Sequence, residues 1–419
     1  MNIAATMTAL GRAARDAATT LAATAGEQRD AALAAAAAEL RRCTARIVDA
    51  NGRDTDAARD RGLGSAMLDR LMLDDGRVEA MAAGIETVIG LDDPLGRVLD
   101  DRVRPNGLRI QRVAVPLGVI GIVYESRPNV TADAAALCIK SGNAAILRGG
   151  SESFRSSAAI YECLRDGLEA AGLPAAAVQM VPTTDREAVG FLLSSMASFV
   201  DVVVPRGGRS LIERVRDDAR VPVIGHLEGI CHVYLHAAAD PGVARDVVLN
   251  AKMRRTGICG AAETLLVDRD VAEALLPDVS EALLAAGCEI RGDETVRSIV
   301  PEAEAASDED WSTEYLDAIV SIRAVDDIDA AIDHIRRYGS AHTESIVTAD
   351  AAAAGKFLRE VDSAIVMHNA STQFADGGEF GFGAEIGIAT GRIHARGPVG
   401  AEQLTSYKYV VRGSGQVRP

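Results

Sequence analysis

One cysteine lies in a segment whose composition suits covalent chemistry. Cys259 falls within NAKMRRTGICGAAETLL, residues 250–266, between Gly257 and Gly260. The cations that precede it are Lys252, Arg254 and Arg255. The AAETLL that follows favours a helix, and a helix N-terminus with nearby cations lowers the pKa of a thiol and favours the nucleophilic thiolate. The alternative is a buried thiol that packs as a small hydrophobic side chain.

The remaining cysteines lack such surroundings. They are Cys43, Cys138, Cys163, Cys231 and Cys288, and their spacing fits neither a CxxC motif nor a metal site. The pattern predicts reduced thiols in a cytoplasmic protein.

An asparagine stands where an oxyanion could be stabilised. In YESRPNVT, residues 124–131, a strand-like run leads into a turn at Pro128 and then into a helix. Asn129, held at such a corner, can donate an amide hydrogen bond to a developing oxyanion. A plain turn asparagine is the alternative.

Two corners resemble the places where α/β sheets bind nucleotides. AAILRGG puts Arg148 at the carboxyl end of a strand, the edge at which such sheets take their ligands. PRGGRSLIERV puts Gly207 and Gly208 between a strand and a helix, where backbone N–H groups can contact phosphate or ribose. No GxGxxG fingerprint is present.

Histidines near the middle of the chain raise the question of a metal. GHLEGICHVYLH carries His226, Glu228 and His232 around a glycine. Because no second cluster of ligands at metal spacing accompanies them, we expect no metal. The segment from His368 to Pro398 is too glycine-rich and polar for a core, and it is typical of a long substrate-facing loop.

The elements that must position these residues follow from periodicity. Residues 1–90 favour helices, and from Leu108 short β-branched runs begin to alternate with helical stretches. The first set of runs is AAILRG, VQMVP, FVDVVVP and VPVIGH; the second is HVYLH, TLLV, DAIVSIRAV, ESIVT and AIVMH. Apolar strands alternating with helices indicate parallel sheets covered on both faces, here as two tandem α/β units with a seam near 225–235. SYKYVVRG, near the C-terminus, is a strand with no local partner.

Composition narrows the function classes. The formal charge is −16 from 44 basic and 60 acidic residues, which disfavours nucleic acid as a partner. No apolar run reaches the ~18 residues of a membrane span. Only four lysines occur, at Lys140, Lys252, Lys356 and Lys408.

Eight motifs in order resemble the gamma-glutamyl phosphate reductases (glutamate-5-semialdehyde dehydrogenases), a proline-pathway family of the aldehyde dehydrogenase superfamily. They are YESRPNVT, SGNAAILRGG, GHLEGICH, the Cys259 loop, WSTEYLDAIVS, YGSAHTESIVT, FADGGEFGFGAEIG and IHARGP. The resemblance implies two doubly wound α/β domains plus a small β oligomerisation flap. The NADP-binding domain would span 1–228, with 100–115 contributing to the flap, the catalytic domain 229–397 and an oligomerisation tail 398–419.

The resemblance implies reduction of L-glutamyl 5-phosphate by NADPH to L-glutamate 5-semialdehyde, with release of phosphate. Cys259 would form a thioester that accepts hydride. Asn129 and the backbone N–H of Cys259 would hold the oxyanion. Hydrolytic aldehyde dehydrogenases carry a glutamate base where this chain has His226, 33 residues before Cys259, so a thioester here would escape hydrolysis.

Binding residues carried over from the family are also expectations. Arg148, Ser151, Gly207, Gly208 and Glu314 would hold the cofactor, and a neutral Ser151 permits NADPH. Candidates for the substrate anions are Arg127, Lys252, Arg255 and Arg396. Gly260, Gln373 and Thr256 depart from the family pattern and leave these anion contacts open.

Two alternatives remain at this stage: an aldehyde dehydrogenase that oxidises another small semialdehyde, and a non-catalytic protein that retains the fold. The resemblance further implies a homo-oligomer, dimer or tetramer. It leaves association with a glutamate 5-kinase open, and nucleic acid and membrane are not expected as partners.

Overall fold

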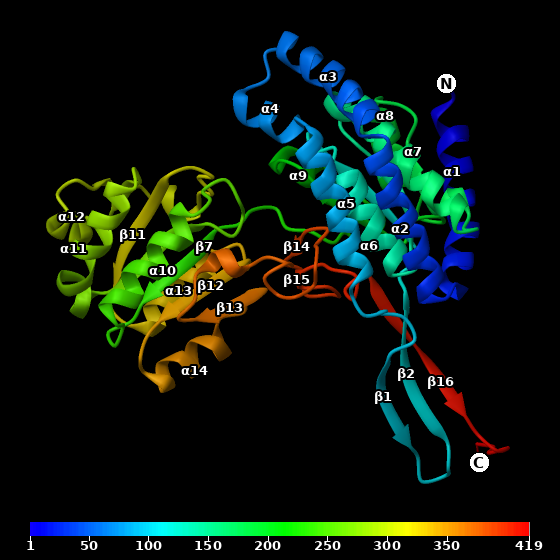
Figure 1. The fold of residues 1–419 in the computed structure, drawn as a ribbon. Coiled ribbons are helices and arrows are strands. Elements are labelled where there is room, and N and C mark those ends of the chain that lie inside the picture. The colour runs from blue at the N-terminus through cyan, green and yellow to red at the C-terminus, as the bar shows by residue number, and fades with distance from the viewer. Residues whose placement is uncertain (419) are drawn as a thin grey trace. The chain divides into compact units, whose positions relative to one another are not determined.

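The computed structural model describes residues 1–418, which divide into two compact units (Figure 1). The first unit comprises 1–225, 381–387 and 399–419, and the second comprises 226–380 and 388–398. The C-terminal tail therefore packs as part of the first unit. Assignment of cofactor binding to one unit and catalysis to the other stays a prediction.

The first unit begins with helices, as residues 1–90 predict. They are α1 (Ile3–Ala23), α2 (Gly26–Arg42), α3 (Thr44–Asp60), α4 (Ser65–Leu71) and α5 (Asp75–Ile89). Their alanine-rich faces allow close packing. A Cβ on Gly167 would lie 2.5 Å from the backbone nitrogen of Ala36, so that glycine lets two helices approach.

A four-stranded parallel sheet with the order β5-β4-β3-β6 follows. Its strands are β3 (Val119–Tyr124), β4 (Ala144–Arg148), β5 (Val178–Met180) and β6 (Val202–Arg206). The accompanying helices are α6 (Val130–Lys140), α7 (Phe154–Ala170), α8 (Arg186–Ser195) and α9 (Arg209–Asp218), with short 3-10 turns at Ser151–Ser153 and Ala175–Ala177. β3 and β4 are buried throughout, which explains their continuous apolar sequences.

The expected strand in VPVIGH is wrong. Only an isolated bridge between Val203 and Val223 forms there. Pro222 has no N–H to donate, so a regular ladder cannot continue through it.

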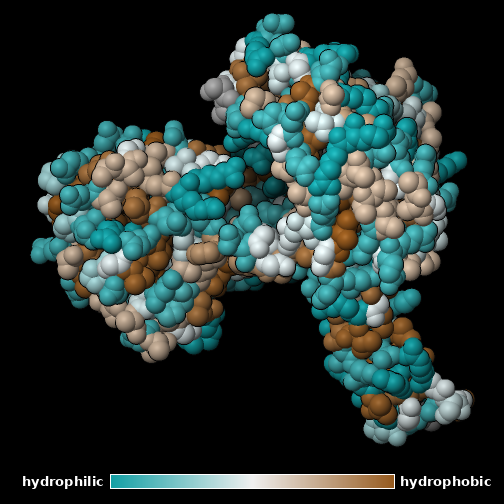
Figure 2. Space-filling model, viewed as in Figure 1, coloured by the Kyte–Doolittle hydropathy of each residue, from teal (hydrophilic) through white to brown (hydrophobic). Residues whose placement is uncertain are grey.

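The lone C-terminal strand finds its partner early in the chain. β1 (Val98–Val103), β2 (Arg109–Pro116) and β16 (Thr405–Arg412) form an antiparallel sheet in the order β1-β2-β16. Thr405 pairs with Pro116 and Arg412 with Arg109. Figure 1 shows the red β16 beside the cyan β2, and Figure 2 shows apolar surface on this sheet.

The second unit is built on a seven-stranded sheet with the order β10-β9-β11-β8-β7-β12-β13, and all its neighbours are parallel. The strands are β7 (Cys231–Leu235), β8 (Ala262–Asp268), β9 (Glu289–Gly292), β10 (Glu304–Ala305), β11 (Ile319–Val325), β12 (Thr343–Val347) and β13 (Ile365–His368). The helices are α10 (Pro241–Met253), α11 (Arg269–Ala285), α12 (Glu294–Ile299), α13 (Ile328–Tyr338) and α14 (Ala351–Glu360).

Both faces of this sheet are covered. One apolar core includes residues of α10, α11 and α12, and another includes residues of α13 and α14. A two-stranded ribbon, β14 (Ile388–Ala389) with β15 (Gly397–Pro398), and 3-10 turns at Asp310–Ser312 and Thr372–Phe374 complete the unit. Across residues 1–418, no helix combines the length and apolarity that a bilayer crossing requires.

The helix expected over AAETLL is also wrong. These residues lead into β8, a central strand buried along its whole length. A strand buried on both faces shows no alternation, and its alanines and leucines suit a helix equally well in sequence. Cys259 therefore does not lie at a helix N-terminus, and the helix dipole cannot activate it as the sequence suggests.

Candidate active site

The candidate nucleophile lies in the loop between α10 and β8. Gln373 fixes the start of this loop: its Nε2 donates to the carbonyl oxygens of Ala251 at 2.9 Å and Arg255 at 3.2 Å. Gln373 is buried, so it links these backbone segments within the protein.

Exposure separates Cys259 from the other cysteines. It is partly exposed, whereas all five others are buried. Burial raises the pKa of Cys138 and Cys231 above the ordinary range and raises the pKa of Cys288 to about 11. Buried thiols of high pKa are poor nucleophiles. Cys259 is therefore the cysteine best placed for chemistry.

Backbone packing fixes the position of Cys259. A Cβ on Gly229 would lie 2.0 Å from the carbonyl oxygen of Cys259, so only glycine fits there. Glu314 accepts a hydrogen bond from the N–H of Gly229 at 2.9 Å, and Cys231 Sγ donates to the Cys259 carbonyl at 3.1 Å. Glu314, expected at the cofactor ribose, thus contacts the segment that supports the thiol.

Two histidines accompany the thiol. His226 Nδ1 lies 2.7 Å from the carbonyl oxygen of Ile388, and its ring meets the ring of His342 edge-on at 4.8 Å between centroids. One potential ligand atom each from His226, Cys259 and His342 lies within 4.8 Å of the other two. Burial, with a smaller contribution from His226, holds the pKa of His342 well below its usual value, so this ring is neutral.

Sequence reasoning found His226 but missed His342. The histidine belongs to YGSAHTESIVT, a motif used only for the family resemblance, and it lies 83 residues beyond Cys259. The signal that could have identified it is its position directly before a strand, β12, that neighbours β7 in the sheet.

The cations expected at the substrate differ in their surroundings. Lys252 is fully buried, and its ammonium pairs with Glu263 at 2.5 Å. Burial raises the pKa of Glu263 to about 7, against the opposing effect of Lys252. Arg396 pairs with Asp362 at 2.7 Å. Arg255 is exposed.

In the first unit, Asn129 is held by a carboxyl group that sequence reasoning missed. Its Nδ2 donates to Asp133 Oδ2 at 2.9 Å. Burial raises the pKa of Asp133 to about 6, although Asn129 and Arg206 oppose the rise. Arg127, two residues before Asn129, is partly buried. Asp133 lies one helical turn beyond Asn129, so spacing alone could have suggested the pair.

The expected cofactor residues Arg148 and Ser151 line one hollow of about 260 Å³ at the carboxyl end of the first unit's sheet. Three arginines and two glutamates contribute charge to its lining: Arg148, Arg186, Arg214, Glu125 and Glu152. Sequence reasoning missed Arg186 and Arg214, which lie on the neighbouring helices α8 and α9.

The buried guanidinium of Arg148 is only partly satisfied. Its Nη1 donates to the Gly149 carbonyl at 2.7 Å and its Nη2 to the Thr184 carbonyl at 2.8 Å, while its Nε has no partner. Glu152 is turned to Ser126, whose backbone N–H donates to it at 2.6 Å. The hollow therefore presents net positive charge, which fits a phosphorylated nucleotide.

Gly207 and Gly208 form the corner that leads into α9. The N–H of Gly208 donates to Glu125 Oε2 at 3.1 Å, and a Cβ on Gly207 would lie 2.5 Å from the same oxygen. This corner and the hollow share Glu125.

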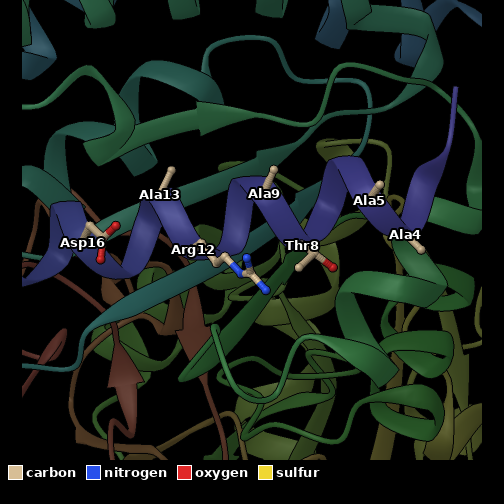
Figure 3. A pocket seen from close by; sticks show the side chains of 7 residues that line it. All are labelled: Ala4, Ala5, Thr8, Ala9, Arg12, Ala13 and Asp16. Carbon is tan, nitrogen blue, oxygen red and sulfur yellow. The ribbon is translucent and has the colours of Figure 1, made fainter.

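A second hollow follows one face of α1 and is lined by small residues with Arg12 and Asp16 (Figure 3). A single helix supplies its whole lining, and no nucleophile or histidine belongs to it. We assign no chemistry to this hollow.

Comparisons with known proteins agree with this arrangement. Residues 3–307 match the sequence model of the Aldehyde dehydrogenase family. The chain is 62% identical to the gamma-glutamyl phosphate reductase of Rhodospirillum rubrum, over 98% of this chain and 96% of that protein. It is 61% identical to that of Hyphomonas neptunium, over 100% of this chain and 97% of that protein.

Solved structures give the same result. A crystal structure of gamma-glutamyl phosphate reductase from Thermotoga maritima matches with a TM-score of 0.96 and 45% identity, over 99% of this chain and all of that chain. The expected aldehyde dehydrogenase-like α/β fold is confirmed. The chain belongs to the aldehyde dehydrogenase family, among its gamma-glutamyl phosphate reductases.

Proposed function

We propose that this chain reduces L-glutamyl 5-phosphate to L-glutamate 5-semialdehyde with NADPH, releasing phosphate, as a step of proline biosynthesis. The observation that carries the proposal is Cys259, the one partly exposed thiol among six cysteines, in a chain 62% identical to a gamma-glutamyl phosphate reductase.

Cys259 performs the covalent step. Its thiolate attacks the acyl carbon, the carbon–oxygen bond to phosphate breaks, and a thioester remains. Bound NADPH supplies the hydride that reduces the thioester carbon. The carbon–sulfur bond then breaks, which releases the aldehyde and regenerates Cys259. The Asn129 amide and the backbone N–H of Cys259 donate hydrogen bonds to the oxyanion in both tetrahedral states.

His226 keeps the thioester on the reductive path. Its Nδ1 is held against the Ile388 carbonyl, so the ring is oriented, and it carries no carboxylate that could activate water. Because hydrolytic aldehyde dehydrogenases carry a glutamate at this position, we expect hydrolysis of the thioester to be slower here, so that reduction competes with it.

The hollow at Arg148 holds the adenosine end of the cofactor. Enzymes of this family use a nicotinamide cofactor, and the unpartnered buried Nε of Arg148 with the neighbouring Arg186 and Arg214 fits a 2′-phosphate. Ser151 lines the same hollow and adds no repelling charge. Gly207 and Gly208 would contact the nicotinamide half of a bound cofactor, and Glu314 would hold its ribose hydroxyls.

Positive side chains bind the anionic substrate. Arg127, Arg255, Lys252 and Arg396 are the candidates for these contacts; Arg396 is paired with Asp362 and Lys252 with Glu263. Arg396 can release the exposed side chain of Asp362 and bind substrate instead. Lys252 is buried and supports the Cys259 loop. The chain functions in the cytoplasm as a homo-oligomer, and association with a glutamate 5-kinase would protect the labile acyl phosphate.

The reverse assay tests the function. Glutamate semialdehyde, NADP⁺ and phosphate are incubated with the full chain, with Cys259→Ala and with Cys288→Ala as the matched buried-cysteine control. We expect NADPH formation that requires phosphate, disappears in Cys259→Ala and persists in Cys288→Ala.

The same assay separates the alternatives. NADPH formation without phosphate would indicate a hydrolytic aldehyde dehydrogenase, and no formation by the unaltered chain would overturn the proposal. Repeating the reverse assay with NAD⁺, and with the variant Arg214→Ala, tests which cofactor the chain prefers. If Arg214 contacts the 2′-phosphate, Arg214→Ala raises the KM for NADP⁺ more than the KM for NAD⁺.

A further inference from the structure

We infer that His226, Cys259 and His342 form a binding site for a soft divalent cation such as Zn²⁺. The bound cation reversibly blocks the nucleophile Cys259. The three residues approach one another because of the sheet. His226 precedes β7, Cys259 precedes β8 and His342 directly precedes β12, and these strands are adjacent in the order β8-β7-β12. All three therefore converge at the amino end of one parallel sheet within the second unit.

The spacing and chemistry of these side chains fit zinc. Their ligand atoms lie within 4.8 Å of one another, and this is the one such group of histidine, cysteine and carboxylate side chains found in residues 1–418. Zn²⁺ binds imidazole at about 2.0–2.1 Å and thiolate at about 2.3 Å, which puts two ligand atoms about 3.5 Å apart. A small closure of side chains therefore suffices, and water or substrate completes a tetrahedral shell.

The outer contacts of both histidines resemble those of metal ligands. A ligating histidine usually engages its second ring nitrogen with a carbonyl or hydroxyl group, which fixes the ring. His226 Nδ1 lies 2.7 Å from the Ile388 carbonyl oxygen, and His342 Nδ1 lies 2.9 Å from Thr343 Oγ1. We assign the Nε2 atom of each ring as the ligand.

His342 gives an independent indication. The residue is fully buried, with 0% of its surface exposed, and its Nε2 has no hydrogen-bond partner. A buried polar atom without a partner costs free energy, which a ligand at this position would recover. Cys231 Sγ lies 3.5 Å from His342 Nδ1 and donates to the Cys259 carbonyl, so it supports the site from outside the ligand set.

Metal binding has a defined chemical consequence. A bond forms between the cation and Cys259 Sγ, the thiol proton passes to solvent, and nothing is oxidised or reduced. The sulfur lone pair is then unavailable for attack on an acyl carbon. Inhibition by the metal rests on the proposed function, whereas binding of the metal does not.

Cobalt(II) and zinc provide the test on the full chain. We expect one Co²⁺ per chain, with the intense absorption of a tetrahedral ion and a sulfur-to-cobalt charge-transfer band that Zn²⁺ abolishes. Cys259→Ala must lose the charge-transfer band. Zinc affinity, measured by competition with a chelating indicator, then compares two histidine variants.

His342→Asn removes the Nε2 atom but keeps an atom near the position of Nδ1. We expect it to weaken Zn²⁺ binding by at least about 10-fold, which is the loss of affinity that changing only the outer contacts of a metal ligand can already produce. His334→Asn is the matched control: His334 is also buried in the second unit, and its Nε2 also lacks a partner. Its zinc affinity stays unchanged.

Several results would overturn the site. The first is the absence of a charge-transfer band in the cobalt spectrum of the unaltered chain. The second is a zinc affinity of His342→Asn equal to that of the unaltered chain, and the third is a loss of zinc affinity in His334→Asn as large as that in His342→Asn. If His342→Asn does not fold, the zinc affinity of His226→Asn and the cobalt spectrum of the unaltered chain decide whether the site exists. In the reductase assay, Zn²⁺ inhibits and a chelator restores activity. Metal binding without any reductase activity would refute the proposed function and leave the site standing.

Discussion

The fate of a thioester on Cys259 depends on whether a base beside it can activate water. His226 is close to the thiol, with ligand atoms within 4.8 Å, and its ring is oriented by the Ile388 carbonyl. A histidine oriented in this way contributes no carboxylate. The proposed function therefore predicts that the side chain at this one position influences whether an acyl group is reduced or hydrolysed.

Introducing a carboxylate here should redirect the reaction. We expect His226→Glu to raise glutamate release from glutamyl phosphate without NADPH by at least about 10-fold, since a positioned general base contributes about 10²–10⁴-fold. His226→Gln, of similar size but with neither an imidazole nor a carboxylate, is the control. Unchanged hydrolysis in His226→Glu would show that His226 does not protect the thioester.

Asp133 gives a second prediction at the residue scale, based on its pKa of about 6. A carboxyl group whose pKa is raised on folding binds more protons in the folded state, so its effect on stability becomes less favourable as pH rises from about 4 to 6. Asp133→Asn, which can still accept from Asn129, removes this effect. We expect Asp133→Asn to gain about 2 kcal/mol of unfolding free energy over the unaltered chain between pH 4 and pH 7.

Denaturant unfolding at several pH values measures that difference. Asp30→Asn provides a comparison, since Asp30 accepts from Lys140 at 2.9 Å and its loss should not reproduce the gain. A constant difference between Asp133→Asn and the unaltered chain across this pH range would contradict the raised pKa.

At the scale of elements, close approach of loops positions the thiol. Gly229, just before β7, packs against the backbone of Cys259, and a Cβ there would lie 2.6 Å from the Cys259 carbonyl carbon. A backbone cannot yield as a flexible side chain does, so the loop before β8 must move. The nucleophile thus depends on a glycine from a neighbouring strand.

Gly229→Ala should lower kcat at least about 10-fold through misplacement of Cys259 and destabilise the second unit by about 1–3 kcal/mol. Gly355→Ala is the control, because Gly355 is an exposed position of α14 with nothing within 4 Å of the added Cβ. That control should stabilise by about 1 kcal/mol. Assays and thermal unfolding measure both, and normal kcat in Gly229→Ala would contradict the packing account.

The elements also show how far sequence reasoning reaches. The N-terminal helices, the alternation of strands and helices and the choice of Cys259 among the cysteines follow from local patterns. The start of β8 was mistaken for a helix in AAETLL, although the overlapping run TLLV was correctly predicted as a strand, because strand pairing, which decides the state of such a run, is not local. His342, Arg186 and Arg214 were missed for the same reason: sheet order brings them to their positions.

For the whole molecule, the sheet β1-β2-β16 is the feature that a monomer does not explain. β16 lies at an edge of the sheet, and an edge strand offers unpaired backbone groups to another chain. Tyr407, Tyr409 and Val411 share one face of it and are 48%, 63% and 55% exposed. An apolar strand face of this kind predicts contact with a second copy.

Charging that face should separate the copies. If the unaltered chain is an oligomer that associates through this face, we expect Tyr409→Lys with Val411→Lys to yield a monomer, because lysines on an edge strand oppose pairing and cost apolar burial. Lys408→Glu, on the opposite face of β16, is the control and should leave the oligomer intact. Sedimentation velocity measures the state, and circular dichroism checks that the fold persists. A double variant with unchanged mass would show that the copies meet elsewhere, and a monomeric unaltered chain would show that this exposed face has no self-partner.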